Sequence, residues 1–265
     1  MPPMWIKVCG ICDVETARAV AAAGVDAIGL NFYEHTPRRI SVETAAAVVN
    51  ALPENVEPVA VFVNHSLSDV LSICQSTGIR TVQLHGDEPA EFLIELRRRD
   101  RSLRILRACR MEAQSSLSEP GRVAPDRAGT ARLGEGEGMI SWQRYLHDCR
   151  RQHAEPDACL IDAHAEDRYG GSGQTVAWDR LAAEYRLGEW PPLILAGGLR
   201  PENVAAAIAA VRPWGVDAAS GVESAPARKD PAKVARFVAA VRGAEESAPV
   251  AACGLAANQE RSPRR

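Results

Sequence analysis

Short apolar stretches alternate along the chain with longer stretches in which apolar residues recur at helical spacing. Eight of the short stretches are almost continuously apolar, which is typical of parallel strands that are covered on both faces. They are WIKVC (5–9), DAIGLNF (26–32), PVAVFVN (58–64), RTVQLHG (80–86), LRILRA (103–108), DACLIDA (157–163), PLILAGG (192–198) and GVDAAS (215–220). The pattern predicts a parallel sheet of eight strands.

The stretches between these strands predict helices. Their ranges include 14–24, 42–52, 89–99, 201–211 and 231–242. Several begin with a helix-start signal, such as Ser41 as an N-cap or Pro201 in the first turn. Eight strand–helix units in a chain of 265 residues predict a single-domain α/β (β/α)8 TIM barrel. An open doubly wound sheet is the alternative, but no Gly-x-Gly-x-x-Gly follows the first strand.

The interval between strands five and six is much longer than the others. Residues 119–138 are rich in Gly, Pro, Arg and Glu and have few large apolar side chains to bury. We therefore expect an exposed, flexible insertion there, followed by a helix over 141–152. The barrel domain is predicted to span 1–243, with a disordered tail over 244–265.

Composition and charge narrow the class of protein. The chain is 46% hydrophobic, so it can bury a full core, and its net charge of −3 does not favour nucleic acid or an anionic membrane as a partner. No apolar run approaches the ~20 residues of a membrane span, and the N-terminus lacks a signal-peptide pattern, so a cytoplasmic location is expected. Seven irregularly spaced cysteines predict free thiols rather than a disulfide framework.

Polar residues at the carboxyl ends of the predicted strands are candidates for chemistry, because barrel enzymes place their active sites there. The candidates are Cys9, Arg38, Gln83, His85 and Asp162. Taken alone, each has an ordinary structural explanation. A strand-end Cys is usually a small apolar side chain, an Asp is often a helix cap, and an Arg on a loop is often a surface residue.

The seventh and eighth strands end in small residues. Gly197, Gly198, Ser220 and Gly221 would let backbone N–H groups approach an anion closely, and barrels often bind a phosphate at this place. The alternative is that these residues only shape tight turns. The combination favours a phosphorylated small-molecule substrate.

Cys9-Gly-Ile-Cys12 has the C-x-x-C spacing of a thiol–disulfide redox pair, which also follows a strand. Against that role, the chain continues far beyond a domain of thioredoxin size. A structural zinc site requires four ligands, and no second C-x-x-C follows, so no metal site is expected.

The chain resembles the phosphoribosylanthranilate isomerase family of tryptophan biosynthesis. The matching stretches, in order, are KVCGI (7–11), GLNFYEHTPRRIS (29–41), AVFVN (60–64), VQLHGDE (82–88), LIDA (160–163), YGGSGQTVAWD (169–179), LAGGLRPENV (195–204) and VDAASGVESAPARKDPAKV (216–234). The resemblance implies an Amadori rearrangement of N-(5-phosphoribosyl)anthranilate to 1-(2-carboxyphenylamino)-1-deoxyribulose 5-phosphate. It implies no cofactor, and it leaves open a homodimer or contact with other enzymes of the pathway.

The resemblance also implies roles for individual residues. Cys9 would be the general base and Asp162 the general acid, with Cys12 a bystander. These roles require the pKa of Cys9 to be lowered or poised, and that of Asp162 to be raised. Lys7, two residues before Cys9 on the same strand face, could help to activate it or could be structural.

Further positions would contact the substrate. Arg38 would bind the anthranilate carboxylate, and Gln83 and His85 would lie beside the substrate. In YGGSGQ (169–174), Gly171 and Gly173 would belong to a mobile lid over the sugar phosphate, unless this segment is a plain turn.

Three other functions compete with the isomerase. One is another phosphate-binding barrel enzyme, such as indole-glycerol-phosphate synthase, which would need catalytic Lys and Glu residues at strand ends. The second is a thiol–disulfide oxidoreductase that uses Cys9 and Cys12. The third is a non-catalytic barrel that serves as an interaction module, a function that the intact set of candidate residues disfavours.

Overall fold

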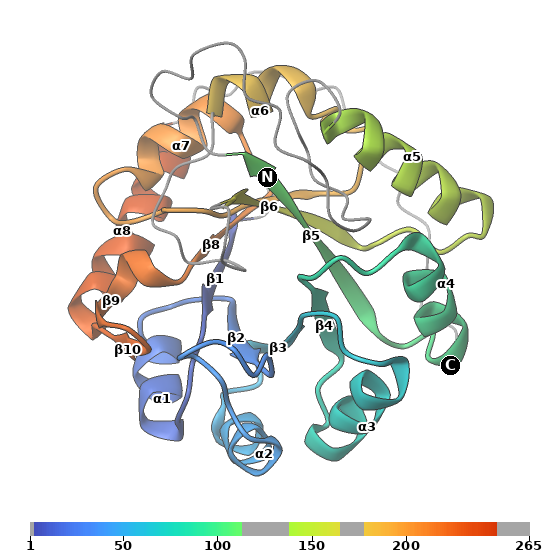
Figure 1. The fold of residues 1–265 in the computed structure, drawn as a ribbon. Coiled ribbons are helices and arrows are strands. Elements are labelled where there is room, and N and C mark those ends of the chain that lie inside the picture. The colour runs from blue at the N-terminus through green and yellow to red at the C-terminus, as the bar shows by residue number, and fades with distance from the viewer. Residues whose placement is uncertain (1–2, 113–137, 165–177, 248–265) are drawn as a thin grey trace.

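A computed structural model describes residues 3–112, 138–164 and 178–247 of the chain. Eight parallel strands close into a barrel in chain order, and β8 pairs back onto β1 (Figure 1). The strands are β1 (Trp5–Cys9), β2 (Ala27–Asn31), β3 (Glu57–Phe62), β4 (Thr81–Leu84), β5 (Arg104–Glu112), β6 (Ala158–His164), β7 (Leu193–Leu195) and β8 (Gly215–Ala218). The predicted barrel of eight strands is confirmed.

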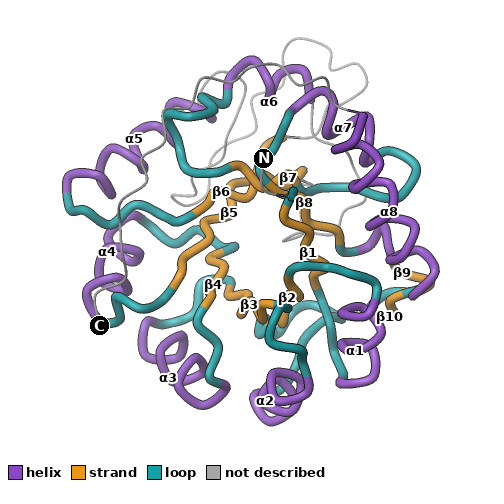
Figure 2. The backbone as a smooth tube through the Cα atoms, turned by 180° about the vertical axis from the view of Figure 1, so that it is seen from behind, coloured by secondary structure: helices purple, strands orange, loops and turns teal. Residues whose placement is uncertain are grey.

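The helices form a ring outside the strands, as Figure 2 shows. They are α1 (Val14–Ala22), α2 (Val42–Ala51), α3 (Leu67–Thr77), α4 (Ala90–Arg99), α5 (Gly138–Arg151), α6 (Trp178–Glu184), α7 (Val204–Val211) and α8 (Pro231–Ser247). A short 3₁₀ helix, η1 (Ser220–Val222), and a hairpin of β9 (Glu223–Ala225) and β10 (Arg228–Lys229) lie between β8 and α8. The sequence did not predict this hairpin.

Capping side chains fix where several helices begin. Asp13 accepts a hydrogen bond from Thr16 N at 2.7 Å, and Ser41 accepts one from Thr44 N at 3.1 Å. Each satisfies a backbone N–H group that the first helical turn leaves without a partner. The loops that join β1 to Asp13 and β2 to Ser41 are therefore held at both ends. They carry Cys12 and Arg38.

Two clusters of buried side chains form the core. The larger one packs the outer faces of the strands against the helices. The smaller one, which includes Trp5, Val59, Leu106 and Leu160, fills the barrel interior. Side chains alternate along a strand, so Lys7 and Cys9 follow Trp5 on the inward face of β1 and lead towards the carboxyl rim.

Some predicted boundaries differ from the structure. Helix α8 continues to Ser247, past the predicted end of the barrel at 243, because good helix formers (Ala244, Glu245) continue the pattern. Arg242 also bonds Glu245 at 3.1 Å in this last part of the helix. Helix α5 begins at Gly138, earlier than predicted. Residues 119–137 of the predicted insertion and 248–265 of the predicted tail lie outside the described residues.

Candidate active site

A pocket opens at the carboxyl ends of the strands. It contains nine of the predicted site residues, namely Cys9, Arg38, Gln83, His85, Asp162, Gly197, Gly198, Ser220 and Gly221. Other residues on its wall include Asn31, Thr36 and Asp217. The predicted lid residues Gly171 and Gly173 lie outside the described residues.

Cys9 is the last residue of β1 and is partly buried. It pairs in register with Gly29 of β2, where a Cβ atom would lie 2.5 Å from the Cys9 sulfur. Any side chain at position 29 would therefore collide with the thiol. The glycine of the GLNF stretch makes room for the Cys9 side chain at the barrel mouth.

A buried ion pair lies beneath Cys9. Lys7 Nζ donates to Asp217 Oδ2 at 2.8 Å, and the Lys7 side chain is fully buried. Burial, the largest single effect, would lower the pKa of Lys7, but the charges of Asp217 and Cys9 and the hydrogen bonds to them together outweigh it and raise that pKa, so Lys7 is a cation at neutral pH. The other Asp217 oxygen, Oδ1, is buried without a hydrogen-bond partner.

The sequence required a pKa of Cys9 that is lowered or at least poised, and a lowered pKa is wrong. Burial raises the pKa of the Cys9 thiol above its ordinary value, because the attraction of Lys7 is weaker than this effect and Asp217 opposes it. The resting site therefore holds mainly a neutral thiol at pH 7. Lys7 acts in the expected direction, but its pairing with Asp217 limits the effect.

Asp162 near the carboxyl end of β6 is buried and faces His85, which directly follows β4. The two are 3.4 Å apart, between His85 Nε2 and Asp162 Oδ2. On the other side of the imidazole, the Gln83 amide nitrogen lies 2.7 Å from Nδ1. An amide nitrogen only donates, so Nδ1 accepts and the ring proton lies on Nε2, which is buried near Asp162 without a hydrogen bond.

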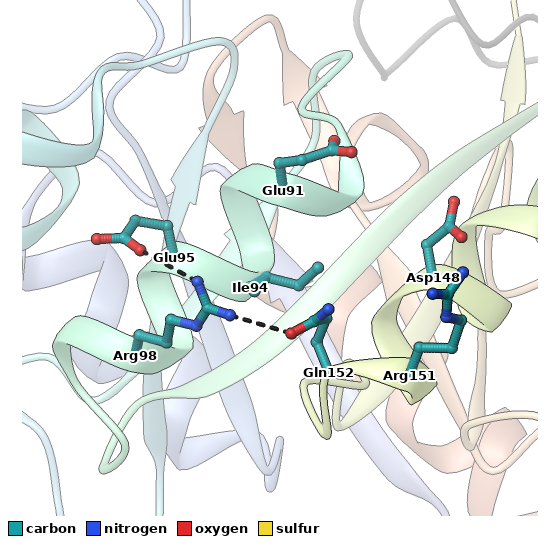
Figure 3. A pocket seen from close by; sticks show the side chains of 7 residues that line it. All are labelled: Glu91, Ile94, Glu95, Arg98, Asp148, Arg151 and Gln152. Atoms are coloured by element: carbon teal, nitrogen blue, oxygen red, sulfur yellow. Dashed lines mark hydrogen bonds and ion pairs between the residues drawn. The ribbon is translucent and has the colours of Figure 1, made fainter.

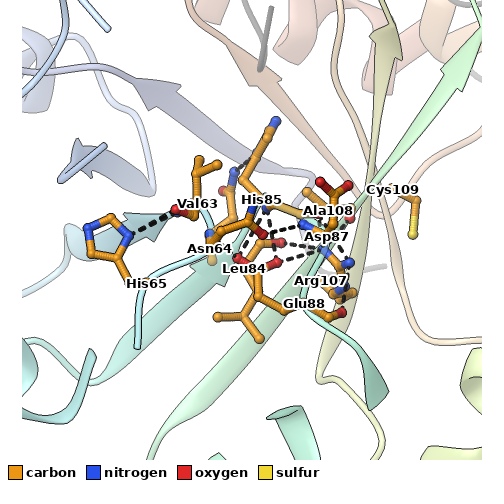
Figure 4. A network of polar contacts seen from close by, with 12 residues as sticks. Val63, Asn64, His65, Leu84, His85, Asp87, Glu88, Arg107, Ala108 and Cys109 are labelled. Atoms are coloured by element: carbon orange, nitrogen blue, oxygen red, sulfur yellow. Dashed lines mark hydrogen bonds and ion pairs between the residues drawn. The ribbon is translucent and has the colours of Figure 1, made fainter. Parts of the chain in front are cut away.

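A network of polar contacts holds the loop that carries His85 (Figure 4). The buried Arg107 donates to Leu84 O at 3.0 Å and to Gly86 O at 3.2 Å. Glu88 accepts from Asn64 N at 2.8 Å and lies 3.3 Å from Arg107. A buried cation and a buried anion are thus each paired and hydrogen-bonded, which makes this loop a rigid support for the imidazole.

Arg38 reaches the pocket from the loop after β2. Its Nε and Nη2 atoms donate to the two carboxylate oxygens of Glu223, both at 2.7 Å. Glu223 also accepts from Lys229 Nζ at 2.7 Å. The guanidinium that the resemblance assigned to a substrate carboxylate is therefore already bound on its side-on edge by a carboxylate of the protein.

The loops after β7 and β8 are closely packed. Gly197 and Gly198 have left-handed backbone angles, with φ of 84° and 64°. At Gly221 a Cβ atom would lie 1.9 Å from the carbonyl oxygen of Leu199. The two loops can approach one another this closely only because these positions have no side chain, as expected for a cradle of backbone groups.

Sequence reasoning assigned no role to Asp217, Glu223 or Lys229. Asp217 could have been noticed as the only charge in the apolar stretch GVDAAS. Glu223 and Lys229 lie in an irregular segment, where nothing in the sequence indicates that Arg38, 185 positions away from Glu223, is the partner.

Cys12 differs from Cys9 in its surroundings. Its sulfur lies 3.8 Å from the carbonyl oxygen of Gly10, and both cysteines are free thiols. Among the described residues, no cluster of three or more His, Cys, Asp or Glu side chains could hold a metal ion. No described helix has the length and apolar character that crossing a membrane requires.

A second hollow lies on the outside of the barrel, between α4 and α5 (Figure 3). Its wall is formed by Glu91, Ile94, Glu95, Arg98, Asp148, Arg151 and Gln152. Arg98 donates to Gln152 at 3.0 Å and lies 4.0 Å from Glu95, so this arginine is already engaged by its neighbours. The hollow lacks the converging buried polar groups of the barrel mouth.

Comparisons with known proteins agree with this geometry. A family model described as N-(5'-phosphoribosyl)anthranilate (PRA) isomerase matches residues 6–122 and 140–240. The N-(5'-phosphoribosyl)anthranilate isomerase of Acidithiobacillus ferrooxidans is 40% identical, over 92% of this chain and 100% of that protein. The enzyme of the same name from Geobacter sulfurreducens is 37% identical, over 90% of this chain and 98% of its own.

Solved structures give the same result. The phosphoribosyl anthranilate isomerase of Thermotoga maritima has a TM-score of 0.72 and 29% identity, with coverage of 91% of this chain and 99% of that chain. A second structure describes monomers of that dimeric enzyme, with a TM-score of 0.67, 28% identity and the same coverage. A third holds reduced 1-(o-carboxyphenylamino)-1-deoxyribulose 5-phosphate, with a TM-score of 0.68, 28% identity and the same coverage.

Proposed function

The chain belongs to the phosphoribosylanthranilate isomerase family, and from that premise we propose that its barrel mouth catalyses the Amadori rearrangement of N-(5-phosphoribosyl)anthranilate. The observation that carries the proposal is the placement of Cys9 and Asp162. They come from β1 and β6 and line one pocket together with the small-residue loops after β7 and β8. A base, an acid and a phosphate cradle thus surround one cavity.

The reaction needs a proton delivered at one atom and removed at another. Asp162 protonates the ring oxygen as the bond from C1′ to that oxygen breaks, which leaves a Schiff base between C1′ and the anthranilate nitrogen. Cys9 then removes the proton from C2′, and the resulting enol rearranges to the 2′-ketone. Because β1 and β6 are separated by β7 and β8 around the ring, the acid and the base do not neutralise one another.

The protonation of Cys9 sets how much of the enzyme is ready to react. The raised pKa of its thiol means that the thiolate is the minor form at neutral pH. Lys7 favours the thiolate from below. In this proposal the active fraction grows as the pH rises, and Lys7 keeps it large enough for turnover.

His85 and Gln83 serve the acid in this mechanism. His85 lies against Asp162 at 3.4 Å, and Gln83 orients the imidazole through Nδ1. We assign His85 the role of positioning Asp162. The rigid loop that Arg107 and Glu88 support keeps the imidazole in place.

The two anionic ends of the substrate have separate hosts. The phosphate binds at the backbone of Gly197, Gly198, Ser220 and Gly221, since backbone N–H groups in tight turns stabilise phosphate. The anthranilate carboxylate binds Arg38, whose guanidinium offers planar paired donors. Both hosts line the same pocket, as a ligand with an anion at each end requires.

An activity assay tests the proposal. Purified protein is added to freshly generated phosphoribosylanthranilate, and the loss of its fluorescence is followed. Catalysed loss by the native chain, absent in the Cys9→Ala variant, is expected. A folded native chain that leaves the rate at its background value would refute the proposal.

Two broader properties are also proposed. A homodimer is supported by the dimeric relative from Thermotoga maritima, and sedimentation equilibrium over a range of concentrations will test it. A cytoplasmic location is proposed because the chain belongs to a family of biosynthetic enzymes, and a fluorescent fusion in the native host would test it.

A further inference from the structure

The Arg38 side chain is fixed at several points along its length. A Cβ atom built on Gly10 would lie only 2.4 Å from the Cδ atom of Arg38. The aliphatic part of the Arg38 side chain therefore packs directly against the loop after Cys9. Its guanidinium is bound side-on by Glu223. The Arg38 and Glu223 side chains are only 14% and 5% exposed, so this is a shielded pair rather than a surface contact.

Glu223 is itself held in place. Lys229 Nζ bonds Glu223 Oε1 at 2.7 Å and Ala219 O at 2.9 Å, and Lys233 Nζ bonds the backbone oxygen of Glu223 at 2.7 Å. Burial would raise the pKa of Glu223, but hydrogen bonds and charges from Arg38 and Lys229 outweigh it and lower that pKa. Glu223 is therefore an anion held between the Arg38 guanidinium and the Lys229 amine.

The remaining donors of Arg38 suit a second carboxylate. A guanidinium has five N–H donors in a planar fork, and Glu223 accepts from Nε and from one hydrogen of Nη2. The opposite edge, formed by Nη1 and the other Nη2 hydrogen, can still bind a carboxylate with two hydrogen bonds. A guanidinium fixed on one side loses less side-chain entropy when the other side binds a ligand.

We propose that Glu223, held by Lys229, is a positioning residue for Arg38: it binds the Nε–Nη2 edge and leaves the Nη1–Nη2 edge for the substrate carboxylate. This inference rests on the proposed role of Arg38 in binding that carboxylate. The hairpin of β9 and β10, which carries both residues, thereby contributes to substrate recognition although neither residue lines the pocket.

The opposite role, in which Glu223 blocks Arg38 until the substrate displaces it, conflicts with the geometry. The Lys229 side chain is 1% exposed, so displacement of Glu223 would leave a buried ammonium group without its counter-ion. Leaving a buried charge unpaired is strongly unfavourable. The substrate therefore binds beside Glu223 and does not replace it.

The test compares two ligands on variant proteins. The ligands are reduced 1-(o-carboxyphenylamino)-1-deoxyribulose 5-phosphate and the same compound without its carboxyl group. Glu223→Gln should weaken the first ligand about tenfold or more and the second less than about twofold. It should raise KM by a similar factor with little change in kcat, because the reacting atoms are elsewhere.

Two further variants guard against misfolding. Glu223→Gln/Lys229→Met removes both charges and leaves no unpaired buried ammonium, and it should show the same loss for the carboxylated ligand only. Glu57 forms another Arg–Glu pair, with Arg104 at 2.9 Å, at the opposite end of the barrel. Glu57→Gln removes the carboxylate of that pair and serves as the control. It should leave the affinity for both ligands unchanged.

Arg38→Ala separates the inference from the role on which it rests. If Arg38→Ala weakens both ligands equally, the proposed role of Arg38 is wrong. A different outcome is that Arg38→Ala weakens only the carboxylated ligand while Glu223→Gln/Lys229→Met binds both ligands as the native chain does. In that case Arg38 binds the carboxylate but Glu223 does not position it. Tighter binding of the carboxylated ligand by Glu223→Gln would identify Glu223 as a competitor and overturn the inference.

Discussion

At the scale of single residues, Cys9 at the end of β1 and Cys12 in the loop that follows differ in their surroundings. Cys9 lines the pocket above Lys7, whereas the Cys12 thiol is directed to the carbonyl of Gly10. Cys9→Ala should abolish turnover with little loss of stability, because the base is removed but the side chain is small. Cys12→Ala should keep most of the native kcat. Fluorescence-based turnover measures both, and equal damage from the two substitutions would contradict a single working cysteine.

Asp162 offers a test of the acid. Asp162→Asn should lower kcat by at least ~10²-fold, the low end of what a positioned acid contributes, with little change in affinity for the reduced product analogue. Asp157→Asn is the control, because Asp157 precedes the same strand at the far end and bonds Arg97 at 2.6 Å. A variant at position 162 that retains most of its kcat would show that another group protonates the ring oxygen.

The pH profile should report the raised pKa of Cys9. A base is active when deprotonated, so kcat/KM should rise with pH and level off only above the range of an ordinary thiol. Lys7→Met removes the charge that favours the thiolate and should move the rising limb to higher pH. The double variant Lys7→Met/Asp217→Asn also removes the Asp217 carboxylate, which disfavours the thiolate. Its rising limb should therefore shift less than that of Lys7→Met. A profile that is identical in all three proteins would mean that the titrating group is not Cys9.

At the scale of elements, the strand ends were predictable and the hairpin was not. A polar residue such as Gln83 or Asp162 at the end of an apolar strand is visible in the sequence, since the strand defines where the rim lies. The strands β9 and β10 have only three and two residues, too few to show a period. Their role depends on a buried carboxylate that meets a distant arginine, which only the tertiary structure determines.

The tight contact between the loops after β7 and β8 gives a prediction for Gly221. A Cβ there would lie 1.9 Å from a backbone oxygen of Leu199, which no side-chain rotation can relieve. Gly221→Ala should cost about 1–3 kcal/mol of unfolding free energy and raise KM, because the phosphate cradle must open. Chemical denaturation and steady-state kinetics measure the two effects.

Gly243→Ala is the matched control for this substitution. Gly243 lies within α8, and a Cβ there meets no atom within 4 Å. The change should stabilise the protein by about 0.5–1 kcal/mol, because alanine favours the helix, and should leave KM unchanged. If Gly221→Ala behaved in the same way, the two loops would not need their close approach.

At the scale of the whole molecule, the alternation of predicted strands and helices was enough to predict the barrel without any information on contacts. The ion pairs inside the barrel could not be predicted in this way. Lys7 and Asp217 lie 210 positions apart and meet only because β8 closes the ring against β1. Closure therefore brings together the groups that adjust the reactivity of Cys9. The burial that raises the pKa of the Cys9 thiol is likewise a property of the folded barrel, so the sequence alone did not show it.

Packing of the helices against the strands buries Cys74 of α3 and Cys149 of α5, and this has a consequence at alkaline pH. Burial raises the pKa of Cys74 and of Cys149 to about 12 each. An unfolded thiol ionises near ~8.5, so the folded state binds protons that the unfolded state loses. Stability from these groups is complete below ~8.5 and is lost as the pH rises towards 12. Each thiol should lower the unfolding free energy by ~1.4 kcal/mol per pH unit in that range.

Urea unfolding under reducing conditions at pH 7, 9 and 10 measures this loss. Cys149→Ala should make the decline with pH shallower, because one of the titrating groups is gone. Ile94→Val, a buried substitution on α4 with no titrating group, should lower the unfolding free energy by about 0.5–1.5 kcal/mol at every pH and leave the slope unchanged. If Cys149→Ala kept the native slope, the folded thiol at this position would ionise as readily as the unfolded one, and the decline would have to come from other groups.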